Sequence, residues 1–143
     1  MKIVIGSDHA GYNLKEYIKN YLKCNEYEVI DVGTYSTDSV DYPTFGFKVG
    51  EEVIKNDCFG ICVCGSGVGI SMAANKIKGI RAVNVNNEEL ATLSRKHNDA
   101  NVICFGERLV KKEDAIKYLE IFLNTPFEGD RHVRRVNMLN EVK

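Results

Sequence analysis

The chain of 143 residues has no tryptophan, only two prolines and no long apolar run. No stretch approaches the ~20 apolar residues that span a bilayer, and the apolar N-terminal segment is too short for a signal peptide. The formal net charge is −1, so no overall positive field would attract nucleic acid. Without a proline-, glycine- or serine-rich linker, we expect one domain over residues 1–143, with neither a membrane nor a nucleic-acid partner.

The five cysteines are an odd number, and Cys58, Cys62 and Cys64 lie within one short stretch. This pattern does not indicate a disulfide framework, so we expect reduced thiols and a cytoplasmic protein. Cys62 and Cys64 share one strand face because strand side chains alternate, which makes a metal pair conceivable. No Cys-x-x-Cys or histidine pair stands near them, and zinc is therefore a weak alternative to buried thiols.

Short apolar runs alternate with stretches in which apolar residues recur at helical spacing. The runs predict strands over residues 2–6, 27–32, 59–64, 80–85 and 101–105. The spacing predicts helices between and after them, including one that carries Ile70, Ala73, Ala74 and Ile77. Because the runs are almost continuously apolar, both sheet faces should be covered. We therefore expect an α/β fold, a three-layer α/β/α sandwich with a five-stranded parallel sheet. Ligands in such folds lie at the carboxyl ends of the strands.

Three alternating glycines follow the third strand, in the segment Cys64-Gly65-Ser66-Gly67-Val68-Gly69. Backbone N–H groups at such a strand-to-helix turn can converge on an anion. The alternative is a tight turn that needs glycine only for its backbone angles. A nucleotide site is a weak interpretation, because the segment lacks G-x-G-x-x-G spacing and the chain lacks a Gly-Lys-Ser/Thr triplet. Cys64 stands just before these amides, where a thiolate could act as a base or a nucleophile.

Three further groups of polar residues could carry chemistry. His97-Asn98 precedes the fifth strand, and histidine is the residue type suited to proton transfer near neutral pH, although a capped loop would have a similar composition. Arg131 and Arg135 share a face if this stretch is helical, which suits a phosphate dianion, and the alternative is a solvated basic face. Asp8-His9 follows the first strand, where the two residues either cap the next helix or contact a ligand.

Together these segments resemble ribose-5-phosphate isomerase type B, of the family that also includes allose- and galactose-6-phosphate isomerases. The matching motifs follow the family's order along nearly the whole chain: Gly6-Ser7-Asp8-His9-Ala10-Gly11-Tyr12, Asp41-Tyr42-Pro43, Cys64 through Ser71, Ala73-Ala74-Asn75-Lys76, Gly79-Ile80-Arg81-Ala82, Ser94 through Asn101, and Gly129 through Val136. Each motif alone is modest, but the ordered set is specific.

The resemblance implies a five-stranded Rossmann-like fold that isomerises ribose 5-phosphate and ribulose 5-phosphate through a cis-enediolate, with no metal or organic cofactor. It implies that Cys64 is the base, that Ser66 assists proton transfer between oxygens, and that His97 opens the sugar ring. Amides of the glycine segment would stabilise the enediolate oxygen. The remaining implied contacts are made to the sugar by Asp8, His9, Tyr42 and Asn98, and to the phosphate by Arg108, Arg131 and Arg135.

Family sites are shared between subunits, so the resemblance implies a homodimer or a dimer of dimers in which His97, Asn98 and Arg108 come from the partner chain. Some members replace the cysteine by a glutamate a few residues on, but residues 70–73 contain no acid here. The main alternative substrate is a six-carbon sugar 6-phosphate such as allose 6-phosphate, because chemistry at C1 and C2 suits either length. Other interpretations are an acyl-transfer enzyme that uses Cys64 and His97, and a non-catalytic phosphosugar-binding module.

Overall fold

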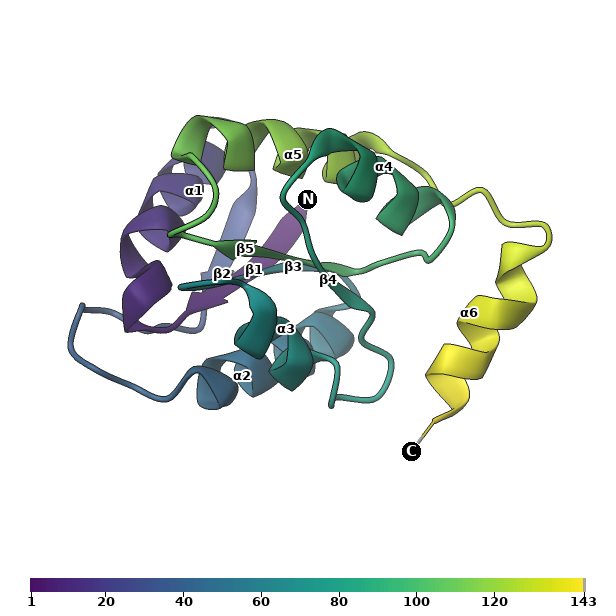
Figure 1. Ribbon diagram of the computed structural model, residues 1–143, viewed down its shortest axis with the longest axis horizontal. Coiled ribbons are helices and arrows are strands. Elements are labelled where there is room, and N and C mark those ends of the chain that lie inside the picture. The colour runs from purple at the N-terminus through teal and green to yellow at the C-terminus, as the bar shows by residue number, and fades with distance from the viewer. Residues whose placement is uncertain (143) are drawn as a thin grey trace.

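The computed structural model describes residues 1–142, in which five strands alternate with helices (Figure 1). The elements are β1 (Lys2–Ser7), α1 (Tyr12–Cys24), β2 (Glu28–Asp31), α2 (Tyr42–Asn56), β3 (Phe59–Cys64), α3 (Val68–Ala74), β4 (Ala82–Asn84), α4 (Glu88–Lys96), β5 (Val102–Gly106), α5 (Lys112–Asn124) and α6 (His132–Glu141). A short 3-10 turn, His9–Gly11, connects β1 to α1. No described helix is long and apolar enough to cross a membrane.

The five strands form one parallel sheet in the order β2-β1-β3-β5-β4. The predicted fold, a Rossmann-like α/β/α sandwich, is therefore confirmed. From β1 the chain passes first to β2 on one side and later to β3 on the other. The helix after β1 (α1) and the helix after β3 (α3) cover opposite faces of the sheet, which opens a crevice at the carboxyl ends of these two neighbouring strands. This crevice is the expected place for a ligand.

Helices cover both faces of the sheet, as the continuous apolar strands predicted. Figure 1 shows α1, α4 and α5 on one face and α2 and α3 on the other. Because side chains alternate along a strand, β3 contributes to two separate cores. Ile61 and Val63 pack in the core under α1 and α5, whereas Cys62 and Cys64 pack in the core under α2 and α3. The two cysteines therefore share a face, as predicted.

Two predicted elements differ from the observed ones by more than one residue at an end. The helix expected to include Ile77 ends at Ala74, because the N–H groups of Lys76 and Ile77 bond three residues back and the chain then turns at Gly79, where φ is +89°. The strand expected over residues 80–85 is only Ala82–Asn84. The C-terminal helix α6 lies beyond the β4 edge of the sheet, away from the two covering layers (Figure 1).

Candidate active site

Cys64 is the last residue of β3 and lies at the carboxyl-end crevice. Its side chain is buried, and Sγ accepts a hydrogen bond of 3.1 Å from the N–H of Gly67. The chain reverses at Gly67, where φ is +79°, and α3 begins at the next residue. A thiolate at this position would be stabilised by the amide it faces, which is the condition for a cysteine that accepts and returns a proton.

Each glycine of the segment allows a different neighbour to approach the turn. Of the three, only Gly67 has a positive φ, so the other two are not needed for backbone angles. A Cβ at Gly65 would lie 2.5 Å from the Arg108 guanidinium, and one at Gly69 would lie 2.7 Å from the Tyr42 ring. A Cβ at Gly67 would overlap the side-chain oxygen of Asn84. Side chains of Arg108, Tyr42 and Asn84 therefore approach the backbone of this turn closely at its three glycines, which a simple turn would not require.

Ser66 stands in this turn with its hydroxyl oxygen accepting a 3.2 Å hydrogen bond from the Val68 N–H. Its carbonyl accepts a 3.1 Å hydrogen bond from the Asn84 side chain. Asn84 ends β4 and was not among the predicted site residues, although a polar residue at the carboxyl end of a strand is a usable signal. It fixes the backbone of the glycine turn from β4, which is separated from β3 by β5 in the sheet.

Asp8 and His9 reach the same crevice from the end of β1. Asp8 is buried, and its Oδ1 accepts a 3.0 Å hydrogen bond from the N–H of Gly11, so the capping interpretation holds for this oxygen. The Nδ1 atom of His9 accepts a 3.1 Å hydrogen bond from the N–H of Val40. His9 thereby ties the loop before α2 to the crevice, and Tyr42 begins that helix.

Arg108 lies at this crevice too, beside Gly65 of its own chain, which corrects the expectation that the partner supplies it. The loop after β5 is bonded to the end of β3: the Glu107 N–H donates to the Cys64 carbonyl at 2.9 Å, and the Arg108 N–H donates to the Gly65 carbonyl at 3.1 Å. The side chain is otherwise exposed. A guanidinium at this point can meet an anionic or polar ligand at the glycine turn.

A second group of predicted residues gathers around the end of α4. His97 caps this helix, and its ring stacks on that of His132 with 4.5 Å between ring centroids. His132 begins α6 directly after Arg131, and Arg135 follows one turn later. Asn98 and both arginines are exposed. The stack was not predicted, because no spacing pattern links positions 35 residues apart.

His132 is a buried histidine whose Nε2 has no hydrogen-bond partner among the described residues. Burial, followed by the charges of Arg131 and the neighbouring His97, lowers the pKa of His132. Glu128 lies 3.7 Å from Nε2, and one ligand atom from each of the three side chains falls within 4.8 Å of the others. However, the two ring planes are only 17° apart, and a nitrogen lone pair lies in the plane of its ring. Lone pairs in two stacked planes do not converge on one ion at about 2 Å, as zinc requires.

Within one chain, the Cys64 group lies at the carboxyl ends of the strands and the His97 group lies at their amino ends. In the parallel register, Cys64 pairs with Gly106 at one end of β5, and Gly60 pairs with Val102 at the other. At about 3.3 Å per residue these ends are roughly 13 Å apart, and His97 precedes Val102 by a further turn. One small sugar phosphate bound at Cys64 therefore cannot also contact His97 of the same chain.

The whole chain has close relatives among known proteins. A family model described as Ribose/Galactose Isomerase matches residues 3–139. Ribose-5-phosphate isomerase B of Escherichia coli is 43% identical, with 99% of this chain and 96% of that protein aligned. The structure of ribose-5-phosphate isomerase B from Clostridium thermocellum has a TM-score of 0.96 at 51% identity, covering 99% and 96% of the chains. That from Mycoplasma genitalium, with bound ribulose-5-phosphate, has a TM-score of 0.92 at 44% identity, covering 97% and 93%. This chain belongs to the Ribose/Galactose Isomerase family.

Proposed function

We propose that this protein interconverts ribose 5-phosphate and ribulose 5-phosphate. The observation that carries the proposal is the Cys64 thiol facing the Gly67 amide in a turn that the Tyr42 ring and the Arg108 guanidinium approach closely. The relatives named ribose-5-phosphate isomerase B support the substrate, and the Mycoplasma genitalium protein binds ribulose 5-phosphate. The reaction moves a hydrogen between C2 and C1, so it needs one base and a site for a developing negative oxygen.

In the proposed mechanism the Cys64 thiolate removes the C2 proton of the open-chain aldose. The electron pair forms the C1–C2 double bond, and the carbonyl oxygen at C1 becomes the enediolate oxygen. Amides of the glycine turn stabilise this charge, because they are oriented before the reaction begins. The Ser66 hydroxyl passes the proton between O2 and O1, and Cys64 returns its proton to C1 to give the ketose.

The aldose enters as a furanose ring, which must open before the C2 proton is acidic. His97 donates a proton to the ring oxygen, and Asn98 holds sugar hydroxyls. Asp8, His9 and Tyr42 contact the sugar from the crevice. Arg131 and Arg135, one helical turn apart, bind the phosphate, and Arg108 assists them from the glycine turn. These assignments follow from the resemblance to the family.

The decisive experiment is a turnover assay with ribose 5-phosphate and allose 6-phosphate in parallel, on the wild type and Cys64→Ala. We expect turnover of ribose 5-phosphate by the wild type only, and retained phosphosugar binding by the variant. Turnover of allose 6-phosphate alone would show that the substrate is this six-carbon sugar phosphate and not ribose 5-phosphate. Binding without turnover by the wild type would favour a non-catalytic module, and full activity of Cys64→Ala would reject the assigned base.

We further propose a homodimer, alone or paired into a dimer of dimers, in which each site combines the crevice of one chain with the His97 group of another. The separation of Cys64 and His97 across the sheet supports this arrangement, because neither group is sufficient alone. Helix α6 also exposes apolar side chains that a second chain could cover: Met138 and Leu139 are 57% and 56% exposed.

Shared sites can be tested by mixing two inactive chains. Cys64→Ala and His97→Asn, each defective alone, should regain activity after mixed refolding. Half of the dimers would then be hybrids, each with one site that has both wild-type groups, so about a quarter of all sites should work. No recovery of activity, with hybrid dimers demonstrated by mass spectrometry, would refute shared sites.

We also propose a cytoplasmic location. It agrees with the five free thiols, of which Cys64 must stay reduced to act as the base.

A further inference from the structure

Asp99 follows the His97-Asn98 pair and takes no part in the proposed chemistry. Its φ is +48°, a left-handed conformation that aspartate tolerates better than most residues. The Asp99 N–H donates to the Arg95 carbonyl at 3.2 Å, and the Ala100 N–H donates to the Ser94 carbonyl at 3.0 Å. This reversal ends α4 and leaves Asn98 exposed at the surface. The direction in which the His97 and Asn98 side chains point therefore depends on the backbone conformation of Asp99.

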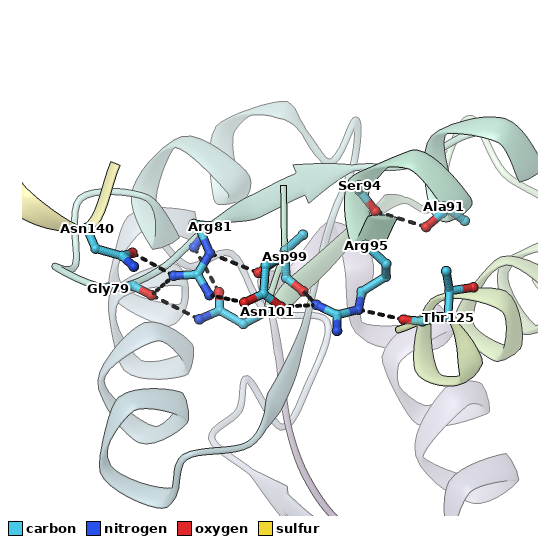
Figure 2. Close-up of polar contacts among 10 residues, drawn as sticks. Gly79, Arg81, Ala91, Ser94, Arg95, Asp99, Asn101, Thr125 and Asn140 are labelled. Carbon is cyan, nitrogen blue, oxygen red and sulfur yellow. Dashed lines mark hydrogen bonds and ion pairs between the residues drawn. The ribbon is translucent and has the colours of Figure 1, made fainter. Parts of the chain in front are cut away.

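Two arginines hold Asp99 from opposite sides, as Figure 2 shows. Arg95 Nη1 donates to Oδ1 of Asp99 at 2.8 Å. Arg81 Nη2 lies 3.6 Å from the other carboxylate oxygen, and Arg81 Nε donates to the Asp99 backbone carbonyl at 2.8 Å. Both the side chain and the backbone of Asp99 are thus fixed.

Arg95 is itself anchored in the protein interior. It is 7% exposed, donates to the carbonyls of Thr125 and Ala100 at 3.1 and 2.7 Å, and lies 4.9 Å from the centroid of the Phe59 ring. A buried guanidinium needs a carboxylate partner, and among the described residues Asp99 is the one acid paired with it. The position of Asp99 is therefore set by the core.

Arg81 extends the same contacts to α6. Its Nη1 donates to the Gly79 carbonyl at 3.0 Å and to Oδ1 of Asn140 at 2.7 Å (Figure 2). Burial lowers the pKa of Arg81, and the charge of Asp99 acts against that effect. Because α6 also provides His132, which stacks on His97, the helix and the His97 segment are joined at two points.

We propose that Arg81, Arg95 and Asp99 are positioning residues that hold His97 and Asn98 in the geometry needed to open a sugar ring bound at Cys64 of another chain. This inference rests on the proposed isomerase function. The three residues need not touch the substrate. Their effect should appear in ring opening and not in proton transfer at C1 and C2.

The test uses Asp99→Asn, which keeps the side-chain shape and tolerates the left-handed conformation but removes the charge between the arginines. Consumption of ribose 5-phosphate should fall by about 10- to 100-fold, as expected when a general acid is misplaced by a fraction of an ångström or more. Exchange of the C1 hydrogen of ribulose 5-phosphate with D₂O should stay within about threefold, because this acyclic ketose needs Cys64 and the amides but no ring opening.

Asp57→Asn is the matched control. Asp57 also has a left-handed conformation at the end of a helix, with φ +47°, but it has no ion pair in the described part of the chain. Both reactions should be unchanged in this variant. Arg81→Lys, which keeps the charge but cannot bond the Asp99 side chain and carbonyl together, should show the same split between the two reactions if Asp99→Asn does not fold.

Equal losses in ribose consumption and hydrogen exchange by a folded dimer would overturn the inference, because they indicate general damage. Unchanged ribose consumption in Asp99→Asn would overturn it as well. Failure of the proposed function looks different, since the wild type itself would then not convert ribose 5-phosphate.

Discussion

Substitution of Gly67 by alanine tests whether the glycine turn is built around its amides. At φ +79° an alanine is strained by about 1–2 kcal/mol. Its Cβ would overlap the Asn84 side chain and lie 2.9 Å from the Phe105 carbonyl carbon, which belongs to β5 and cannot withdraw. Overpacking of this kind adds about 1–3 kcal/mol. The free energy of unfolding should therefore fall by about 2–5 kcal/mol, which does not exceed the lower end of the 5–15 kcal/mol typical of a domain.

The activity of Gly67→Ala should fall further than its stability suggests. Relief of the overlap moves the Gly67 N–H away from Cys64 Sγ, which it meets at 3.1 Å in the wild type. Loss of one preorganised donor typically reduces kcat by about 10²–10³-fold. The assay is initial-rate isomerisation of ribose 5-phosphate together with urea unfolding of the same preparation.

Gly129→Ala provides the control for backbone strain. Gly129 has a similar φ of +76°, but the nearest side-chain atom to a Cβ there is 4.0 Å away. This variant should lose about 1 kcal/mol and remain within about threefold of wild-type kcat. If Gly67→Ala were as stable as Gly129→Ala and kept kcat within tenfold, the assignment of a tightly packed amide donor beside Cys64 would be wrong.

Two further predictions concern pH. Burial opposes ionisation of Asp31, but hydrogen bonds from Lys15, the Gly33 N–H and Lys19 hold the pKa of Asp31 below its usual value. The ionised carboxylate therefore contributes to stability above about pH 4, and this contribution is lost as the pH falls further. Lys15→Met should destabilise the protein by about 3 kcal/mol at pH 7 and weaken this acid dependence in urea titrations; an unchanged acid slope would contradict it. The lowered pKa of buried His132 means that the unfolded chain binds its proton first, so stability should fall below about pH 6.5. His132→Phe should flatten that decline between pH 7 and pH 5.5, and an equally steep decline would assign it to another group.

Contiguous features of the sequence were predicted well. The strand Phe59–Cys64 has its predicted bounds, because an apolar run that ends in glycine is both a buried strand and its stop signal. The prediction that the helix includes Ile77 was wrong because apolar spacing was again read as regular structure. Ile77 does pack inward, close to Gly50, but from a turn and not from a helix. Apolar spacing reports which side chains are buried, and several backbone conformations can bury the same side chain.

Contacts between distant segments were not accessible in the same way. Arg81, Arg95 and Asp99 form one network from helix α4 and two loops, and each alone resembles an ordinary charged residue in the sequence. The His97–His132 stack depends on how α6 returns to the end of α4. Such contacts require the packing of the elements, which a periodicity argument does not provide.

The topology nevertheless explains why Cys64 and His97 are separated within one chain. The order of strands and helices along the sequence is enough to predict this separation. In a parallel sheet built from βα units, residues that follow a strand lie at the carboxyl ends of the strands, and residues that follow a helix lie at their amino ends. Arg108 follows β5 and must therefore lie at the carboxyl ends with Cys64, which is why its assignment to the partner was wrong. His97 follows α4 and must lie at the amino ends. A reaction that needs both Cys64 and His97 can therefore occur only where the carboxyl ends of the strands of one chain meet the amino ends of the strands of another.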